Sequence, residues 1–461
     1  MSIHPHDPGD LASLTPAPRR GREMDRRLFI VGAAGSGLCL AAGSVAPLSI
    51  AERRLVAATL GADGRTAPDL LEALMTYARR EAGQRLRPSS IDRAWTLEAA
   101  RRDLGRELAA ARQDGRLAEW IAGLSPRAPD YAALQGLKTR YASFAQAGDW
   151  SAWDGPARLL PDARDPQVAR LRARLSAEGY SAPAAEPELF DRGLADALRV
   201  FQANHGLTVD GVPGPATRRE LNVAPAARLA AIEANLERAR WSPRLRAPDR
   251  VEVDTGLQVA RLIVGGQEHL RMPVVVGAPA HPTPMFAAQI EAVVANPFWN
   301  VPDSIARNEL LPAERRRPGH LAAMGIGWVN GRLRQRPGPQ NALGLTKLEV
   351  RSPFDVHLHD TPAKALFSKP VRAFSHGCIR LEQAEAMATA LLGTLNMPLD
   401  PYRQALHTGA TTRWPLVRPL PLIVTHTTVA TDDYGRALFR PDIYGWDRKL
   451  TLALAQSARQ G

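Results

Sequence analysis

Residues 354–381 read FDVHLHDTPAKALFSKPVRAFSHGCIRL, and they decide how the rest of the chain is interpreted. Three histidines, two aspartates and one cysteine lie within this short stretch. The cysteine thiolate is a nucleophile whose free pKa is ~8.5, and a neighbouring imidazole both lowers that pKa and carries the proton. His359 and Cys378 are therefore candidates for a catalytic pair.

The local pattern around these two residues predicts how they are held. Residues 355–359 alternate like a strand, which places His357 and His359 on the same side. Gly377 allows a tight backbone before Cys378, so we expect the turn of Ser375 and Gly377 to bring amides together as an oxyanion hole. A helix expected over 382–392 would follow the cysteine, favour its thiolate and lower its pKa below the free value. We expect this helix to turn Ala386, Ala390 and Leu391 inward.

Sixteen residues separate His359 from His376, which is followed by Gly377 and Cys378. This spacing resembles the L,D-transpeptidases of peptidoglycan synthesis, whose pattern is a histidine, a gap of this length, and then Ser/Thr-His-Gly-Cys. The resemblance implies that Cys378 is the acyl-accepting nucleophile and that His359 accepts and donates its proton. His376 is a further catalytic candidate, which would line the oxyanion pocket, contact substrate or hold the turn. Arg380 stands where many members have asparagine, and we expect it to bind substrate.

The resemblance resumes at two segments upstream of the motif. Residues 296–302 read NPFWNVP and residues 336–344 read RPGPQNALG, and they supply Trp299 and Asn341 as expected substrate contacts. The stretch between them is helical in pattern and basic, and residues 303–347 are assigned to a lid-like insertion over the groove. A solvated basic loop is the alternative interpretation.

The composition bounds the class of protein. The chain has 461 residues and 45% apolar content, and this length and apolar content are enough for several buried cores. Its formal net charge is +12. The arginines are spread along the whole chain and form no single basic patch, so nucleic acid is not expected as a partner. An evenly basic surface suits an anionic cell envelope.

The first fifty residues resemble a twin-arginine export signal. Arg26 and Arg27 precede an apolar run to about residue 42, and candidate cleavage positions follow at Ala46 and Ala51. Pro47 after the first position favours the second. We therefore expect a periplasmic protein, with an uncleaved N-terminal anchor as the alternative and no integral membrane span in the mature chain.

Cysteine usage adds weight to a reactive thiol. The other cysteine, Cys39, lies within the export signal, so the mature chain would hold Cys378 alone. An exported protein with one cysteine has no internal disulfide to explain it. A metal site built from His357, His359, His376 and Asp360 is not expected, because no second cysteine or zinc-type spacing accompanies them. His357 is assigned a structural role, and no cofactor is expected.

The remaining pattern predicts an α+β multidomain protein with a mostly β catalytic domain. Apolar spacing indicates a helical scaffold, and residues 201–222 resemble the three-helix peptidoglycan-binding domain. The expected boundaries are 1–51 for the extension and signal, 52–155 for the scaffold, 160–223 for the peptidoglycan-binding-like module, 226–246 for a linking helix, 249–430 for the catalytic domain and 431–461 for a C-terminal segment.

Together these features predict an L,D-transpeptidase that forms 3-3 cross-links between peptidoglycan stem peptides through a cysteine thioester. The resemblance further implies acylation by carbapenems. The alternatives are an L,D-carboxypeptidase or cross-link hydrolase that uses the same cysteine, and a non-catalytic scaffold that binds peptidoglycan. The expected partners are stem peptides and glycan, and we expect a monomer.

Overall fold

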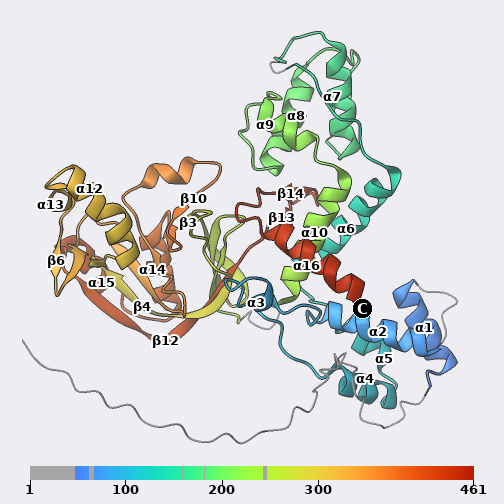
Figure 1. Ribbon diagram of the computed structural model, residues 1–461, viewed down its shortest axis with the longest axis horizontal. Helices are drawn as coiled ribbons and strands as arrows, with labels where there is room; N and C mark the ends of the chain where they lie inside the picture. Colours follow the sequence, from blue (N-terminus) through green and yellow to red (C-terminus); the bar gives the residue numbers. More distant parts are fainter. Residues whose placement is uncertain (1–46, 62–66, 157–158, 181, 242–246, 461) are drawn as a thin grey trace, which may run out of the picture. The chain divides into compact units, whose positions relative to one another are not determined.

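The computed structural model describes residues 47–61, 67–156, 159–180, 182–241 and 247–460 (Figure 1). Residues 1–46 of the predicted extension and export signal lie outside the described residues. The described chain is an α+β multidomain structure, as the sequence predicts. None of the described helices combines the length and the apolar run that crossing a bilayer requires.

Among the described residues, six helices precede the three-helix module. They are α1 (Ile50–Leu60), α2 (Ala67–Glu81), α3 (Pro88–Ile91), α4 (Leu104–Gln113), α5 (Leu117–Ala122) and α6 (Pro129–Ala147). Ser49 caps α1 in a reciprocal box with Glu52, and Leu48 is buried. Cleavage after Ala51 would therefore remove both the helix cap and a core side chain, whereas cleavage after Ala46 would leave them in place.

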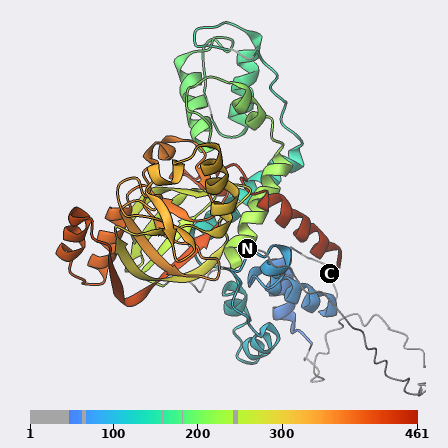
Figure 2. The same cartoon turned by 60° about the vertical axis from the view of Figure 1, so that its left-hand side comes forward.

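The module itself consists of α7 (Pro166–Ala177), α8 (Arg192–Asn204) and α9 (Pro215–Leu221), which group together in both ribbon views (Figures 1 and 2). Val168, Leu171 and Leu175 face Leu194, Leu198 and Phe201 in its core. Gln202 organises the turn after α8, because its side-chain oxygen accepts the amides of Asp210 and Gly211. These residues therefore act in the core and the turns.

The linking helix α10 (Pro225–Trp241) packs against α6, and Ile232 and Leu236 are buried with the α6 stripe. The C-terminal part adds β13 (Val429–Thr431), β14 (Ala437–Phe439) and α16 (Trp446–Gln460). The sequence analysis does not anticipate α16. Its Trp446 and Leu450 pack with Trp241 of the linking helix.

The catalytic part is a nine-stranded sheet in the order β10-β3-β11-β9-β8-β4-β12-β1-β2. Its strands are β1 (Arg250–Asp254), β2 (Val259–Val264), β3 (Gln267–Gly277), β4 (Phe286–Ala295), β8 (Thr346–Arg351), β9 (Leu358–His359), β10 (Ala373–Ser375), β11 (Ile379–Leu381) and β12 (Thr412–Thr425). A further pairing between β2 and β3 closes the sheet on itself. Gly265 and Gly266, both at positive φ, form the predicted hairpin turn between these strands.

Two helices, α14 (Ala384–Thr394) and α15 (Asp400–Thr408), pack on this sheet, and the 3₁₀ helix η2 (Lys364–Ser368) lies between β9 and β10. The predicted inward face of α14 is only partly right. Leu391 is buried, but Ala386 and Ala390 are half-buried. The helix turns Ala384, Met387 and Ala388 to the core.

The apolar sequence from Pro421 to Thr428 predicts a strand, and the strand is much longer in the structure, where β12 begins at Thr412 and ends at Thr425. Its first half contains Pro415 and Pro419, which argue against a strand because proline donates no ladder hydrogen bond. A register shift between Pro415 and Leu420 accommodates this irregular part against β4.

The insertion between β4 and β8 combines helices with a small sheet. It contains β5 (Trp299–Asn300), α11 (Asp303–Ile305), the π-helix η1 (Ala306–Leu310), α12 (Leu311–Arg316), α13 (His320–Ala323), β6 (Ile326–Val329) and β7 (Arg332–Gln335). Leu310, Leu321 and Leu333 form its own apolar core. The insertion is therefore a folded element, not a solvated loop.

Candidate functional site

Cys378 lies in the turn that joins β10 to β11, and its side chain is half-buried. The thiol Sγ lies 3.9 Å from the carbonyl oxygen of Asp355. Asp355 adopts φ 52°, an unfavourable conformation for a residue with a Cβ, at a cost of ~1–3 kcal/mol. The sequence analysis assigns this residue no role. Its backbone presents a hydrogen-bond acceptor to the nucleophile.

The sheet brings the cysteine and the two histidines onto adjacent strands. β11 runs parallel to β9, with Ile379 opposite Leu358 and Arg380 opposite His359. The amide of Ile379 donates to the carbonyl of His357 at 3.0 Å, so Cys378 continues this register opposite His357. Because side chains alternate along a strand, Cys378, Arg380, His357 and His359 share one face.

His359 is buried, and its ring is fixed by one hydrogen bond. Nδ1 lies 2.5 Å from the carbonyl oxygen of Asp360, which only an N–H can satisfy. The Nε2 atom is therefore left as the unprotonated, basic nitrogen. Burial lowers the pKa of His359 to about 3, and the Asp360 carbonyl opposes this shift only in part. The ring is thus neutral near pH 7, with Nε2 as its unprotonated nitrogen.

His357 is tied into the strand in a different way. Its Nδ1 accepts the amide of Val350 at 3.1 Å, and its Nε2 lies 3.3 Å from a carboxylate oxygen of Asp355. Burial lowers the pKa of His357 as well. Both ring nitrogens are engaged, which agrees with the structural role expected from the sequence.

The electrostatic expectation for Cys378 is wrong. Burial raises the pKa of the thiol, although a backbone hydrogen bond from His357 opposes the shift. No helix N-terminus follows the cysteine directly, because β11 stands between Cys378 and α14. A protonated thiol, not a preformed thiolate, is the ground state that this environment favours.

The turn before the cysteine is braced from both sides. Ser375 Oγ donates to the Cys378 carbonyl at 2.5 Å and accepts the Gly377 amide at 3.1 Å. Gly377 has φ 108°, which explains the glycine. Its amide is thereby occupied and does not serve as the predicted oxyanion donor. Among the residues that the structure describes, the Cys378 amide has no acceptor and is the better candidate.

A second set of hydrogen bonds reaches this turn from the C-terminal segment. Thr283 Oγ1 donates to the Gly377 carbonyl at 2.8 Å and accepts the Gly277 amide at 2.9 Å. Tyr444 donates its hydroxyl to the Gly277 carbonyl at 2.8 Å. The sequence analysis assigns Thr283 and Tyr444 no role, because neither residue lies near the motif in the chain.

His376 is exposed and points away from the buried side of the turn. Its Nε2 lies 2.6 Å from a carboxylate oxygen of Glu309, which belongs to η1 in the insertion. Its ring lies 4.9 Å from that of His281. The structure therefore gives His376 a contact with the lid-like insertion.

Arg380 is half-buried on β11 beside the cysteine. Burial lowers the pKa of its guanidinium, and the nearby Cys378 sulfur acts in the opposite direction. Its Nε is buried without an acceptor among the described residues. The expected role of Arg380 in binding substrate stays a prediction.

Two residues expected to contact substrate are structural instead. Asn341 is buried, and its amide donates to the carbonyls of Pro297 and Arg336, which uses both of its N–H groups. Trp299 packs against the apolar core of the insertion. The segments 296–302 and 336–344, which contain these two residues, therefore help the insertion to fold.

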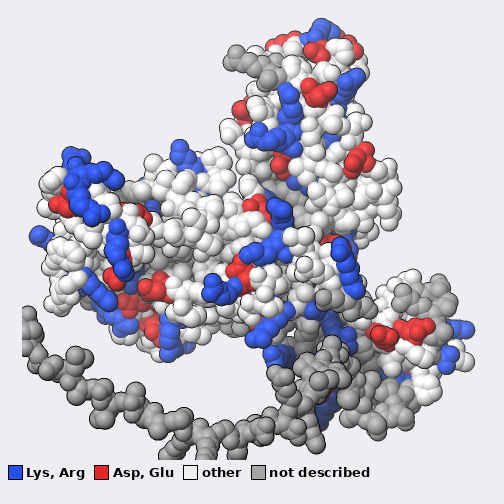
Figure 3. Space-filling model, in the orientation of Figure 1, with Lys and Arg blue, Asp and Glu red and all other residues white. Residues whose placement is uncertain are grey.

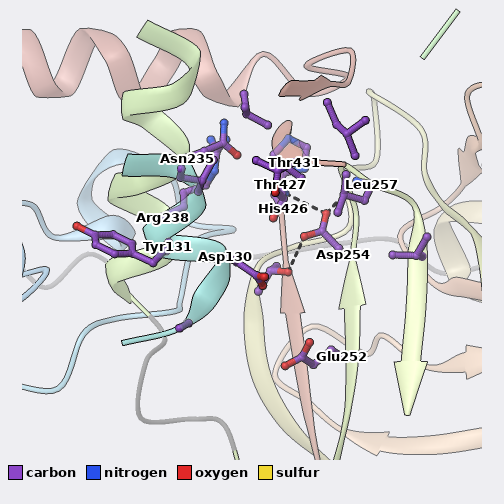
Figure 4. A pocket seen from close by; sticks show the side chains of 18 of the residues that line it. Asp130, Tyr131, Asn235, Arg238, Glu252, Asp254, Leu257, His426, Thr427 and Thr431 are labelled. Carbon is purple, nitrogen blue, oxygen red and sulfur yellow. Dashed lines mark hydrogen bonds between the residues drawn. The ribbon is translucent and has the colours of Figure 1, made fainter. Parts of the chain in front are cut away.

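Elsewhere in the described chain, a cavity of about 810 Å³ lies against the ends of β1 and β12 (Figure 4). The carboxylate of Asp254 faces it, but the amides of Gly256, Leu257 and Thr427 already saturate one carboxylate oxygen. None of the predicted site residues lines this cavity. The described residues also contain no cluster of three His, Cys, Asp or Glu side chains arranged to hold a metal.

Comparison with known families accounts for three parts of the chain. Residues 248–411 match the model described as "L,D-transpeptidase catalytic domain", residues 164–221 match "Putative peptidoglycan binding domain", and residues 69–137 match "Scaffold domain". These matches confirm the family resemblance drawn from the motif. The chain therefore resembles L,D-transpeptidase catalytic domains over residues 248–411 and peptidoglycan-binding domains over residues 164–221.

A protein of Haemophilus influenzae named "Putative L,D-transpeptidase" is 30% identical over 205 residues, which cover 40% of this chain and 42% of the relative. The chain thus spans less than half of that relative's length. Solved structures that resemble the chain include an L,D-transpeptidase from Xylanimonas cellulosilytica (16% identity, 59% of this chain and 98% of that one, TM-score 0.21) and one from Mycobacterium smegmatis (18% identity, 39% and 59%, TM-score 0.22). TM-scores of this size support no structural inference.

Proposed function

We propose that this protein is an L,D-transpeptidase that joins peptidoglycan stem peptides through a thioester on Cys378. The observation that supports it most directly is the state of His359. Its Nδ1–H is fixed on the Asp360 carbonyl, its Nε2 is basic, and it lies on the strand next to the nucleophile. A neutral imidazole on the strand next to the nucleophile is in the protonation state from which a general base acts.

In the first half-reaction, the Cys378 sulfur attacks the carbonyl of the third stem residue while its proton passes to His359 Nε2. The carbon–nitrogen bond to the terminal D-Ala then breaks. The D-Ala amine leaves with the proton from His359, and the stem remains as a thioester. The Cys378 amide stabilises the oxyanion formed on the way.

In the second half-reaction, the side-chain amine of another stem attacks the thioester carbonyl. His359 takes a proton from that amine and returns it to the sulfur as the carbon–sulfur bond breaks. The products are a 3-3 cross-link and the free thiol. Two acyl transfers thus replace one direct exchange of amides, and the balance needs no co-reactant.

We further propose that the protein acts in the periplasm after export through the twin-arginine-type signal. The capping box at Ser49 and the burial of Leu48 favour a mature chain that begins before Leu48. N-terminal sequencing of the secreted protein tests this. A mature N-terminus at Glu52 would overturn the boundary proposed here.

The test of function is incubation of the purified protein with disaccharide-tetrapeptides, followed by mass analysis of the products. We expect a 3-3 dimer and free D-Ala, and we expect neither with Cys378→Ala. Release of tripeptide alone would mean that water is the acceptor. Unchanged substrate, with a folded protein, would favour the binding scaffold. Intact-mass measurement after addition of a carbapenem locates the reactive thiol independently of the acceptor.

A further inference from the structure

A cleft of about 220 Å³ lies where the peptidoglycan-binding domain meets the catalytic domain and the C-terminal segment. Gly206 and Leu207 contribute from the binding domain, and Pro441 contributes from the C-terminal segment. Pro370, Val371 and Arg372 contribute from the segment that leads into β10 and the nucleophile turn. Three parts of the chain therefore share this small cleft.

The charge in this cleft is entirely positive. Arg372 and Arg440 are its only ionisable lining side chains, and neither forms a salt bridge within the described residues. The two guanidiniums are close enough that Arg372 contributes to lowering the pKa of Arg440, after the larger effect of burial. Across much of the surface, by contrast, acidic and basic side chains are interspersed (Figure 3). Two half-buried, unpaired cations side by side are unfavourable unless an anion joins them.

The hydrogen bonds show which donors remain for a ligand. Arg372 uses its three side-chain nitrogens on the carbonyls of Val274, Lys369 and Gln258. Arg440 uses only Nη1, on the carbonyls of Asn204 and Phe439. In the part of the chain that the structure describes, its Nε and Nη2 have no acceptor, and they are not sealed from solvent. These two atoms form the edge of a guanidinium that suits a carboxylate.

We infer that this cleft binds a carboxylate of a peptidoglycan stem peptide, with Arg440 as its main donor and Arg372 as supporting charge. This inference rests on the proposed function. Its position supports the assignment, because only five residues lie between Arg372 and Cys378, and the chain from one to the other spans at most ~22 Å. An extended tetrapeptide measures ~14 Å, so one anchored stem and the reacting stem lie within reach of the same glycan strand.

A pair of guanidiniums should distinguish stems with free carboxylates from amidated stems, which the catalytic thiol does not do. A stem with free carboxylates places a charge between the two guanidiniums, whereas an amidated stem does not. Hydrogen bonds between charged groups are the stronger ones, so we expect amidation of the stem carboxylates to weaken binding about tenfold. Added salt should weaken the binding of the free-carboxylate stem in particular.

The test uses full-length protein carrying Cys378→Ala, so that binding is measured without turnover. The decisive pair of variants is Val371→Glu and Val371→Gln, because Val371 lines the cleft and its side chain makes no hydrogen bond that the change would remove. The two differ only in charge. We expect Val371→Glu to bind a disaccharide-tetrapeptide about tenfold more weakly than Val371→Gln in calorimetry. Equal affinities for the two variants would overturn the inference.

Two further measurements test the role of Arg440 and show whether the cleft binds a stem carboxylate or any anion. Arg440→Gln should lose affinity for the free-carboxylate muropeptide, and Arg440→Lys should recover part of it. The amidated muropeptide should bind all variants equally. Inorganic phosphate that displaces the muropeptide from Val371→Gln at the affinity of the muropeptide itself would indicate a general anion site and overturn the stem assignment.

Acylation by a carbapenem distinguishes failure of the cleft from failure of the proposed function. In the background that retains Cys378, Val371→Glu should acylate at the same rate as Val371→Gln, because the cleft lies apart from the thiol. If cross-linking is intact but Val371→Glu and Val371→Gln bind the muropeptide with equal affinity, only the proposal for the cleft is wrong. If Val371→Glu binds more weakly than Val371→Gln but the protein forms no cross-links, the cleft binds the anion and the transpeptidase assignment is wrong. Thermal melting of each variant verifies that it folds.

Discussion

Glu309 Oε1 lies 2.6 Å from the Nε2 of His376, and this contact joins the insertion to the turn that carries the nucleophile. Glu309 belongs to the π-helix η1, a rare geometry that is often found at functional sites. His376 stands two residues before Cys378. The insertion is therefore held on the nucleophile turn by a pair of side chains and is not merely adjacent to it.

Removing this contact should favour water over the amine as acceptor. We expect Glu309→Ala to raise the ratio of tripeptide to dimer, because a released insertion admits solvent to the thioester. Arg307→Gln on the same π-helix is the matched control, since its exposed pairing with Asp303 lies away from the turn. Product ratios by mass spectrometry decide the point, and equal ratios in the two variants would show that the contact does not govern acceptor choice.

Deletion of residues 303–334, the change that the sequence alone suggests, is a poorer test. The insertion contains its own apolar core, which includes Leu310, Leu321 and Leu333. The deletion would remove that core and leave Trp299 and Val301 without their partners. The single substitution at Glu309 keeps the core intact.

The two neighbouring histidines should differ sharply in their effect on catalysis. His359→Gln removes the basic Nε2 and should slow acylation of Cys378 by ~10²- to 10⁴-fold. His357→Gln changes a ring that is bound to Val350 and Asp355, and it should act mainly on stability. Single-turnover acylation rates measure the difference. Similar rate losses in both folded variants would contradict the assignment of the base.

The pH dependence of alkylation should follow the buried thiol. Because burial raises the pKa of Cys378, its alkylation by iodoacetamide should still increase with pH beyond the range in which a free cysteine has reached its plateau. Mass analysis of the peptide that holds Cys378 gives the rate at each pH. A plateau below ~8.5 would indicate a preformed thiolate and contradict the environment described here.

The stability of the catalytic domain should also depend on His359. Its pKa falls from 6.5 in the unfolded chain to about 3 in the fold, so between these values the unfolded state binds the extra proton. The contribution of His359 to the free energy of unfolding is therefore fully present above pH 6.5 and is lost as the pH falls toward 3. His359→Gln should flatten this part of the unfolding profile in urea. An unchanged profile would mean that the ring is not buried in its neutral form.

The motif predicts which residues meet at the site because His359, Gly377 and Cys378 are close in sequence and their spacing carries the signal. Local apolar periodicity likewise predicts the three-helix module and the linking helix. What fails depends on distant contacts. The pKa direction of Cys378 depends on how the closed sheet buries it, and the roles of Thr283 and Tyr444 depend on a fold that brings residues from both sides of the motif to one turn.

That bracing can be tested through Tyr444. Tyr444→Phe keeps the ring, which stacks on His426, but it removes the hydroxyl that donates to the Gly277 carbonyl. Loss of this hydrogen bond should cost ~0.5–1.5 kcal/mol of stability and slow acylation several-fold by loosening the turn. Tyr434→Phe, at an exposed position, is the control. An acylation rate equal to that of the control would show that the turn is rigid without Tyr444.

The peptidoglycan-binding domain should depend on a buried charge cluster where it meets α6 and α10. Glu178 is almost fully buried, and it accepts from Arg174 at 2.9 Å and from the Tyr141 hydroxyl at 2.8 Å. Burial opposes its ionisation, but the neighbouring side chains of His205, Arg228 and Arg174 hold the pKa of Glu178 at about 2. Glu178→Gln would leave Arg174 buried without a counter-charge.

We expect this substitution to lower stability by ~3–5 kcal/mol in chemical denaturation, because removing one partner of a buried ion pair strands the other. Glu186→Gln, which breaks an exposed pair with Arg164, should have no measurable effect. The pH profile provides a second measurement. Glu178 titrates at 4.5 when unfolded, so its contribution is present above pH 4.5 and is lost as the pH falls toward 2. If the stability of Glu178→Gln still falls with pH in that range, the acid sensitivity arises from other carboxylates.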